Sequence, residues 1–312
     1  MTPTLRTGIL LALSTAAISG VSNFVAKISV TVVKNATVFT FLKNAIVGVL
    51  IIGLVVLFVK WKELRELKRV DWYKLVAIAV VGGSVPFLLF FNGLTQTTAV
   101  HASLIHKTLF VWVAILAWFS LKERFTYWHG IAIALLLGGT FALGGLNGFH
   151  FGKGEWMVLG ATLLWAVENI IAKKALANLS TLTVVAARMF LGSIVLLGVV
   201  IAQGKLSVVS VLTFDQWGWV ILPSLLLFGY VLTWYSALKR APATLVASLL
   251  VPATFITALL SGTFRKVPIT GQQWLSGALV IAGVVLFIWA SRRAARTAVQ
   301  PNAQPATTRH DA

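Results

Sequence analysis

Four ionisable side chains lie deep inside apolar stretches of the sequence. Glu168 is the only carboxylate well inside such a stretch, and Lys43, Lys107 and Arg188 are cations in three others. A charge at the centre of a bilayer costs about 2.5–3.5 kcal/mol on insertion scales, so such residues face a protein interior or an aqueous cavity. We expect Glu168 to line a central cavity and to bind a cationic group or take up a proton there. The alternative is a structural ion pair between Glu168 and Arg188.

Polar and aromatic neighbours surround Glu168 on its own helix. Trp165 lies three residues before it and shares its helix face, while Asn169 is adjacent. Asn23 is the counterpart of Asn169 in the first half of the chain, as shown below. Buried amides of this kind bind substrate or join helices by hydrogen bonds, and both uses remain open.

Titratable side chains also gather before residue 108. His106 and Lys107 could relay protons or hold an anionic group, because histidine titrates near neutrality. Positions 101 and 106 are about 140° apart on a helix, so His101 and His106 do not both point straight into one cavity. We expect His101 to lie at the outer interface and to be hydrated.

Two aromatic residues add a possible cavity wall. Trp234 and Tyr235 are adjacent in a later apolar stretch and could contact a ligand. Ordinary helix packing is the commoner role of aromatic residues in apolar helices, and it is the alternative here.

These residues must be positioned by membrane helices. Hydrophobic residues make up 58% of the 312 residues and charged residues 11%, with a mean hydropathy of +0.91. That leaves too little polar surface for a water-soluble globule. Because a membrane helix needs about 20 apolar residues, we predict an all-α integral membrane protein with ten spans, near 8–29, 37–59, 74–94, 98–120, 127–146, 155–175, 181–202, 217–238, 243–264 and 271–291.

The positive charges predict the topology. The net charge is +18, but Lys and Arg fall in the short connections between apolar stretches, which is typical of membrane topology and not of nucleic-acid binding. Alternate connections are strongly enriched in them. Both termini, residues 1–7 and 292–312, are therefore predicted to be cytoplasmic, in an inner or plasma membrane. The tail is polar and contains two prolines, so we expect it to be disordered.

The chain repeats itself. Ser19–Lys27 aligns with Trp165–Lys173, which places Asn23 on Asn169, and Lys43 corresponds to Arg188 in the second span of each half. We expect two five-helix repeats, 8–146 and 155–291, joined by an extracytoplasmic linker, 147–154. Because five is odd, the second repeat enters the membrane from the opposite side. Inverted repeats of this kind recur in transporters that work by alternating access.

These residues resemble a known family, the EamA-type members of the drug/metabolite transporter superfamily. The resemblance covers about Gly8 to Ser291 and rests on the ten spans, the Lys43 and Arg188 positions and the segments Leu121–Thr126, Leu238–Ala243 and Pro252. The sequence departs from the family pattern in three places, with Lys43 in place of arginine, Thr108 near a usual proline, and Val267 opposite Glu123. The resemblance implies a proton-driven or exchange-driven carrier that often exports amino acids, other metabolites or drugs.

Other classes of function lack support in the sequence. There is no cysteine, the five histidines have no ligand spacing, and no set of catalytic residues or nucleotide-binding loop is present. We expect no enzyme activity, metal or cofactor, and a secondary-active exporter of small molecules, with protons as possible partners. The alternative is a non-transporting scaffold or receptor-like protein. The buried cations favour a carboxylate-bearing substrate, and amino acids would also satisfy Glu168. The sequence does not indicate an oligomeric state.

Overall fold

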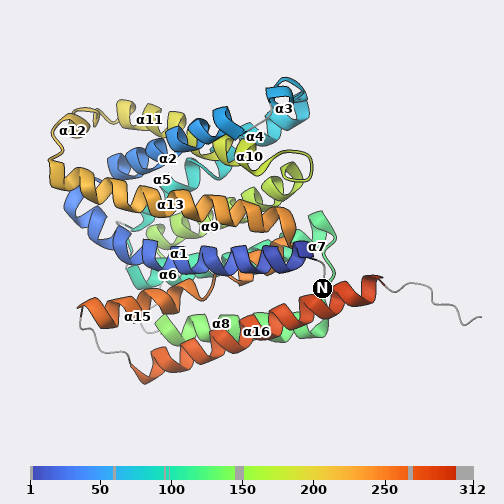
Figure 1. Cartoon of the computed structure of the whole chain (residues 1–312). Coiled ribbons are helices and arrows are strands. Elements are labelled where there is room, and N and C mark those ends of the chain that lie inside the picture. Colours follow the sequence, from blue (N-terminus) through green and yellow to red (C-terminus); the bar gives the residue numbers. More distant parts are fainter. Residues whose placement is uncertain are drawn as a thin grey trace, which may run out of the picture.

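The computed structural model describes residues 3–58, 61–94, 96–97, 99–144, 151–265 and 270–299, and these residues form helices joined by short connections (Figure 1). The first half contains two short helical breaks and one short surface helix. Its elements are α1 (Pro3–Val33), α2 (Ala36–Phe58), α3 (Trp61–Arg65), α4 (Arg69–Val81), α5 (Val85–Leu94), α6 (Ala99–Lys107), α7 (Leu109–Leu121) and α8 (Tyr127–Gly144).

The second half follows the same order. Its elements are α9 (Lys153–Ala175), α10 (Thr181–Ala186), the π-helical segment η1 (Ala187–Leu191), α11 (Gly192–Ala202), the short α12 (Ser207–Ser210), α13 (Phe214–Arg240), α14 (Ala243–Ser248), α15 (Ala253–Arg265) and α16 (Gly271–Val299). In each half, the fourth span is made of two helices in line, α6 with α7 and α14 with α15.

The predicted ten-helix membrane fold is confirmed. In the described part of the chain, nine segments are long and apolar enough to cross a bilayer, and the helix at 127–142 is apolar but shorter. The chain ends differ from the prediction, because α1 begins at Pro3 and α16 continues to Val299, past the predicted end at 291. Residues 300–312 of the predicted tail, and residues 147–150 of the predicted linker, lie outside the described residues.

The two halves of the chain interlock. The first span of each half packs along the third span of the other half, α1 on α13 and α9 on α4 and α5. Like spans also pair, α2 with α10, η1 and α11, and α8 with α16. A pseudo-two-fold axis in the membrane plane produces this exchange. In Figure 1, α8 and α16 lie side by side at one margin of the bundle, so the other eight spans enclose its centre.

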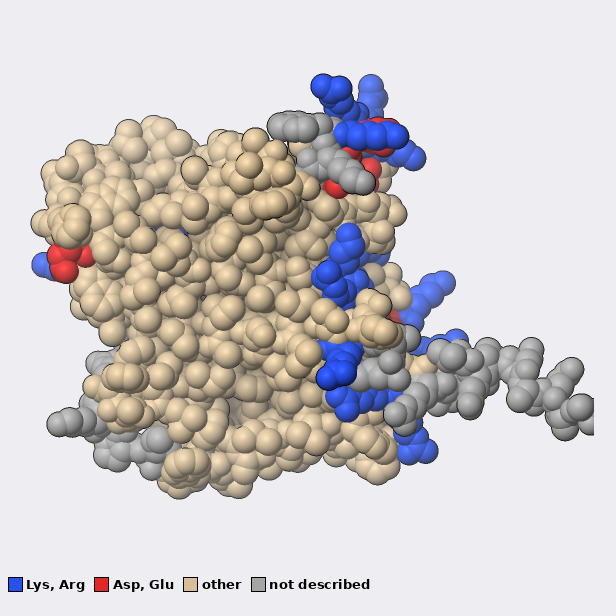
Figure 2. Space-filling model, viewed as in Figure 1, with Lys and Arg blue, Asp and Glu red and all other residues tan. Residues whose placement is uncertain are grey.

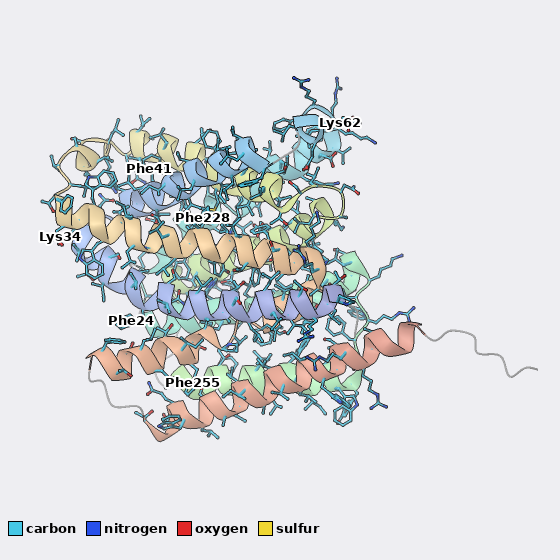
Figure 3. All side chains as sticks on the ribbon, viewed as in Figure 1. Phe24, Lys34, Phe41, Lys62, Phe228 and Phe255 are labelled. Atoms are coloured by element: carbon cyan, nitrogen blue, oxygen red, sulfur yellow. The ribbon has the colours of Figure 1, made fainter. Side chains whose placement is uncertain are left out.

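Charged side chains gather at one edge of the helix bundle. In Figure 2 most of the visible Lys and Arg side chains lie along the edge on the right, a small group of blue and red side chains lies at the left edge, and the surface between them is almost entirely tan. Figure 3 shows Lys62 at this charge-rich edge and Lys34 at the opposite, charge-poor edge. The start of α1 and the end of α16 lie on the charge-rich side (Figure 1), as an even number of spans requires.

Backbone chemistry explains the break between α4 and α5. Pro86 has no N–H and its ring collides with the carbonyl four residues earlier, which is that of Gly82. The helix therefore opens over Gly82–Ser84, and the Gly82 oxygen is left for other donors. At the break between α14 and α15, Pro252 follows Ser248 by four residues and acts in the same way on the Ser248 carbonyl. At the break between α6 and α7 there is no proline, and the Thr108 hydroxyl donates to the Ile105 oxygen at 2.6 Å.

Candidate functional site

Residues from eight spans enclose a cavity of about 180 Å³ at the centre of the bundle. We call it the central cavity. Every span contributes to its wall except α8 and α16. The wall consists of Ser19, Ser22, Asn23, Lys43, Phe87, His106, Lys107, Leu109, Trp165, Glu168, Asn169, Arg188, Leu227, Tyr230, Trp234 and Leu250.

Nearly all the candidate residues selected from the sequence meet at this cavity. Nine of them are on its wall, namely Asn23, Lys43, His106, Lys107, Trp165, Glu168, Asn169, Arg188 and Trp234. Tyr235 is fully buried and contacts the cavity indirectly, because its hydroxyl donates a short hydrogen bond to Oε1 of Glu168. The structure therefore brings these side chains into one place from helices that are far apart in the sequence.

Glu168 is held by a neutral partner and not by a cation. Its side chain is buried, with 1% of its surface exposed, and accepts from Tyr235. In the described part of the chain, no nitrogen of Arg188 lies within 4.0 Å of a Glu168 oxygen, so the direct ion pair considered above is absent. The carboxylate of Glu168 consequently remains available to a ligand in the cavity.

The cations of the cavity outnumber its carboxylate. The cavity wall contains three cations, Lys43, Lys107 and Arg188, and one carboxylate, that of Glu168. Within the described residues, neither lysine has a carboxylate within 4.0 Å. The Lys43 nitrogen instead lies 5.5 and 5.6 Å from the ring centroids of Phe39 and Phe87, at cation–π distance. A bound anionic group would compensate the excess positive charge.

The two amide positions found in the sequence repeat have different surroundings. Asn169 donates to the Trp165 oxygen at 2.8 Å and accepts from the Trp234 indole at 3.2 Å, so its amide joins α9 to α13. This is the helix-joining role that the sequence left open. Asn23 is on the cavity wall and, within the described chain, makes no side-chain hydrogen bond. Its amide is therefore the freer of the two to contact a ligand.

Two polar atoms near the cavity lack a partner. Nε of Arg188 and Nδ1 of His106 are buried and, among the described residues, make no hydrogen bond. The His106 ring packs at 4.9 Å from the Trp165 ring. Buried polar groups are normally paired, and unpaired ones often mark functional sites or unplaced ligands.

Several wall residues were not selected from the sequence. Ser22, Phe87, Leu109, Tyr230 and Leu250 are neutral residues in apolar helices, where nothing distinguishes a cavity-facing position from a packed one. The sequence did contain a signal for Tyr230, which lies one helical turn before Trp234. In the structure the two rings stack, with their centroids 6.0 Å apart and an interplanar angle of 7°. No group of three or more His, Asp or Glu side chains that could hold a metal ion occurs among the described residues.

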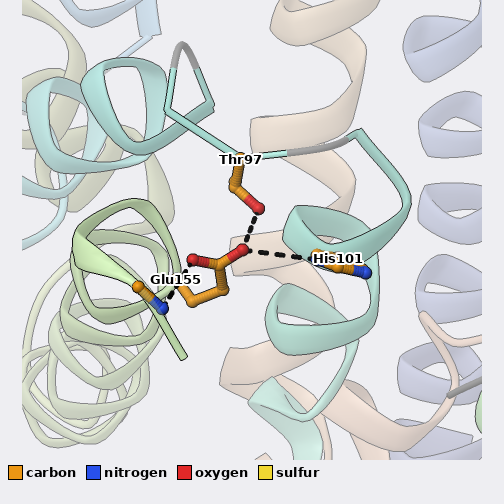
Figure 4. Close-up of polar contacts among 4 residues, drawn as sticks. Thr97, His101 and Glu155 are labelled. Atoms are coloured by element: carbon orange, nitrogen blue, oxygen red, sulfur yellow. Dashed lines mark hydrogen bonds and ion pairs between the residues drawn. The ribbon is translucent and has the colours of Figure 1, made fainter. Parts of the chain in front are cut away.

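A second buried carboxylate, Glu155, joins the ends of two helices near the charge-poor edge. The Thr97 hydroxyl donates a short hydrogen bond to its Oε1, which also lies 3.3 Å from Nδ1 of His101, and the Gly152 amide donates to Oε2 at 3.0 Å (Figure 4). His101 lies near the charge-poor edge with 17% of its side chain exposed, so its hydration stays a prediction, but its contact with Glu155 was not predicted and Glu155 itself was missed. Its position at the start of a span suggested an exposed interface, but Glu155 is 6% exposed.

Side chains from the first repeat cap helices of the second repeat at the charge-rich end. Oε1 of Glu123 accepts from the Ala243 amide at 2.6 Å, and Oε2 accepts from the Thr244 amide and hydroxyl at 3.2 and 2.6 Å. Glu63 accepts from the Ser180 amide and the Thr183 hydroxyl, both at 2.8 Å. These carboxylates stabilise the starts of α14 and α10. Val267, the expected counterpart of Glu123, lies outside the described residues.

Two interlocked helical repeats around a polar cavity in the middle of an apolar bundle define the architecture of a membrane carrier. Residues 6–145 and 152–289 each match the EamA-like transporter family, which covers nearly the whole chain. The chain belongs to this family, within the drug/metabolite transporter superfamily, and is a membrane transporter.

Relatives from bacteria and an archaeon agree with this assignment. The chain is 25% identical over 240 residues to the uncharacterized transporter sll1164 of Synechocystis, covering 72% of this chain and 67% of that protein. It is 22% identical over 265 residues to an uncharacterized transporter of Methanothermobacter thermautotrophicus, covering 77% and 76%. It is 23% identical to YetK of Bacillus subtilis, another uncharacterized transporter, over 82% and 78% of the chains.

A solved crystal structure has the same fold. It superposes with a TM-score of 0.78 at 20% identity, and the match covers 93% of this chain and 99% of the other.

Proposed function

We propose that this transporter exports amino acids or related small metabolites that carry both a carboxylate and an amine. The observation that supports this most is the composition of the central cavity, in which three cations and one carboxylate face the same space. Lys43 and Lys107 would attract the carboxylate of the substrate, with Arg188 as a third donor. Glu168 would attract its amine. The volume of about 180 Å³ is below the roughly 300–1,000 Å³ of pockets for drug-sized ligands, which favours a small metabolite.

The proposed orientation follows the distribution of charge. The charge-rich edge, where Lys62 lies in Figure 3, would face the cytoplasm of a cell or inner membrane, because cytoplasmic connections carry an excess of Lys and Arg. Both chain termini would then be cytoplasmic. The charge-poor edge, where Lys34 lies, would face outward.

Alternating access would proceed by movement of one repeat against the other. At the charge-rich end, Lys173 donates to the backbone oxygens of Leu238 and Ala241 at 2.5 and 2.7 Å, and Lys239 donates to the Leu179 oxygen at 2.8 Å. These bonds join helices within the second repeat, whereas the caps made by Glu63 and Glu123 join the first repeat to the second. The caps would have to break for the substrate to enter from the cytoplasm, and their reformation would close this path.

Energy would come from an ion or substrate gradient. A proton taken up by Glu168 would release the amine of the substrate, because a neutral carboxyl group no longer attracts it. The bond from Tyr235 would keep the side chain in place in both states. Exchange of one metabolite for another is the alternative source of energy.

Transport in proteoliposomes tests this proposal. Purified protein is reconstituted with a mixture of amino acids inside, and their efflux is followed with and without an imposed pH gradient. Selective efflux of one class of amino acid supports the proposal, and dependence on the gradient supports proton coupling. If folded and inserted protein moves none of them, the substrate class is wrong. If it also moves no anion, cation or neutral metabolite from a wider pool, a non-transporting role is favoured.

A further inference from the structure

A second cavity, of about 210 Å³, lies beside the central cavity toward the charge-poor edge. We call it the vestibule. Its wall comes from the junction of α1 with α2, from α5 and from Lys205 in the connection between α11 and α12. The lining residues are Lys34, Asn35, Ala36, Thr37, Thr40, Phe87, Leu88, Phe91, Asn92 and Lys205. Lys34 is visible at the edge of the bundle in Figure 3.

The charge of the vestibule is entirely positive. Lys34 and Lys205 are on its wall, and no Asp or Glu is. Within the described chain, neither lysine has a carboxylate within 4.0 Å. Asp215, in the first turn of the neighbouring α13, is not part of the wall. The wall of the vestibule therefore carries two positive charges and no negative one.

Unpaired donors accompany this charge. The Thr40 hydroxyl is buried, with 2% of the residue exposed, and has no hydrogen-bond partner among the described residues. Thr40 belongs to the vestibule wall, one turn after the start of α2. Asn35 accepts from the Val38 amide at 3.1 Å. The backbone amides of Ala36 and Thr37 are in the first turn of α2, where no carbonyl of the helix is available to accept from them. Free amides at a helix start and nearby lysines are the groups that bind a carboxylate or phosphate.

The vestibule is adjacent to the central cavity. Phe87 belongs to the walls of both, and the Lys43 nitrogen lies 5.6 Å from the centre of its ring. Phe87 therefore lines both the cavity that contains Lys43 and the vestibule that contains Lys34 and Lys205.

We propose that the vestibule is a second binding site, specific for the anionic group of a small carboxylate or phosphate compound and held by Lys34, Lys205 and the start of α2. Only one part of this proposal rests on the proposed function, namely that an exported substrate binds here on its way out. Binding itself does not depend on transport. Free metabolites and lipid headgroups both offer such a group, so the test has to separate these two sources.

Cysteine protection tests the site, because the natural chain contains no cysteine. A single cysteine is introduced at Thr37, on the vestibule wall, or at Ser207, an exposed residue of α12 off that wall. Each variant is placed in nanodiscs of neutral lipid, which leave both faces accessible. The rate of labelling by a charged maleimide is then measured at increasing concentrations of succinate, the probe anion.

We expect succinate to slow the labelling of Thr37→Cys and not that of Ser207→Cys. Adding Lys34→Gln and Lys205→Gln should weaken the protection by roughly tenfold, because two charges that attract the anion are lost. Adding Lys43→Gln should leave the protection unchanged, since Lys43 lines the other cavity. Both lysines of the vestibule are at least partly exposed, so these variants are expected to fold, and thermal unfolding verifies this.

Two results would overturn the proposal. One is protection that persists unchanged without Lys34 and Lys205, and the other is protection that disappears with Lys43→Gln, which would place the anion in the central cavity. Nanodiscs with phosphatidylglycerol identify the source. Slow labelling before succinate is added, relieved by the two lysine substitutions, would support the site and assign it to a lipid headgroup. A protein that binds succinate here but transports no amino acid would contradict only the proposed function.

Discussion

Trp165 and Arg188 donate hydrogen bonds to the same atom, the backbone oxygen of Gly82, at 3.1 and 3.3 Å. That oxygen is free because Pro86 removes its helical donor. One broken helix of the first repeat thereby positions two side chains of the second repeat on the wall of the central cavity. The π-helical turn η1, in which Arg188 lies, fits the same pattern, since such turns often occur at functional sites.

Gly83→Ala should destabilise the protein. A Cβ atom at this position would lie 2.2 Å from the Arg188 oxygen, and backbone of that kind cannot move aside without shifting η1. Overpacking of this sort costs about 1–3 kcal/mol or more. Gly198→Ala is the matched control, because nothing lies within 4 Å of its Cβ position and alanine favours a helix by about 0.5–1 kcal/mol. Thermal unfolding in detergent measures both, and equal melting temperatures for the two variants would contradict the predicted contact.

Glu168→Gln should reduce transport of an amine-bearing substrate by about tenfold to a hundredfold, because hydrogen bonds to charged groups contribute about 1.5–3 kcal/mol. Glutamine can still accept from Tyr235, so folding should be unchanged. Initial rates in proteoliposomes measure the effect. Glu66→Gln is the control, since Glu66 is exposed and pairs only with Lys62, at 3.7 Å. Wild-type rates for Glu168→Gln would show that its charge has no part in transport.

Glu155→Ala should loosen the charge-poor ends of α6 and α9. It removes the acceptor of the Thr97 hydroxyl and the Gly152 amide and the partner of His101. Hydrogen bonds to a charged group contribute about 1.5–3 kcal/mol, and we expect less for each of these because Gly152 is exposed and Thr97 and His101 are half-buried. We expect faster hydrogen exchange across Ala99–Lys107, with Glu155→Gln intermediate because its amide oxygen still accepts. Unchanged exchange in this segment would mean that the cluster in Figure 4 does not hold the helices together.

Glu123→Ala should free the start of α14 at the charge-rich end. Three donors from Ala243 and Thr244 lose their acceptor. Loss of a helix N-cap costs about 0.5–2 kcal/mol, so a cysteine placed at Ala243, which keeps the backbone donor, should react with maleimide faster in this background than in the Glu123→Gln background. If the two backgrounds react at the same rate, Glu123 does not control access to this end of the bundle.

The sequence predicted the helices and the cavity candidates for one physical reason. Lipid tolerates neither unpaired backbone nor isolated charge, so long apolar stretches had to be helices, and Glu168, Lys43, Lys107 and Arg188 had to point inward. The Asn23 and Asn169 correspondence indicated the repeat because duplicated halves keep their polar positions. These features depend on the membrane and not on details of packing.

Features that depend on packing could not be predicted. Phe87 and Leu250 are as compatible with a lipid-facing surface as with a cavity wall. Thr108 breaks its helix with a side-chain hydrogen bond and without the proline that would have marked it. Glu155 is near a span end, where exposure is the usual state, but Thr97 in the connection after α5 and His101 in α6 contact it.

Transport by a protein with a filled cavity tests the central claim most directly. Ser22 is a small residue on the cavity wall, and Ser22→Trp would occupy much of its volume of about 180 Å³. Exchange of a labelled amino acid across proteoliposomes is compared for the wild type, Ser22→Trp and the surface control Ser207→Trp, all verified to be folded. We predict exchange by the wild type and by the control, and none by Ser22→Trp. Wild-type exchange by Ser22→Trp would show that substrate does not pass through this cavity.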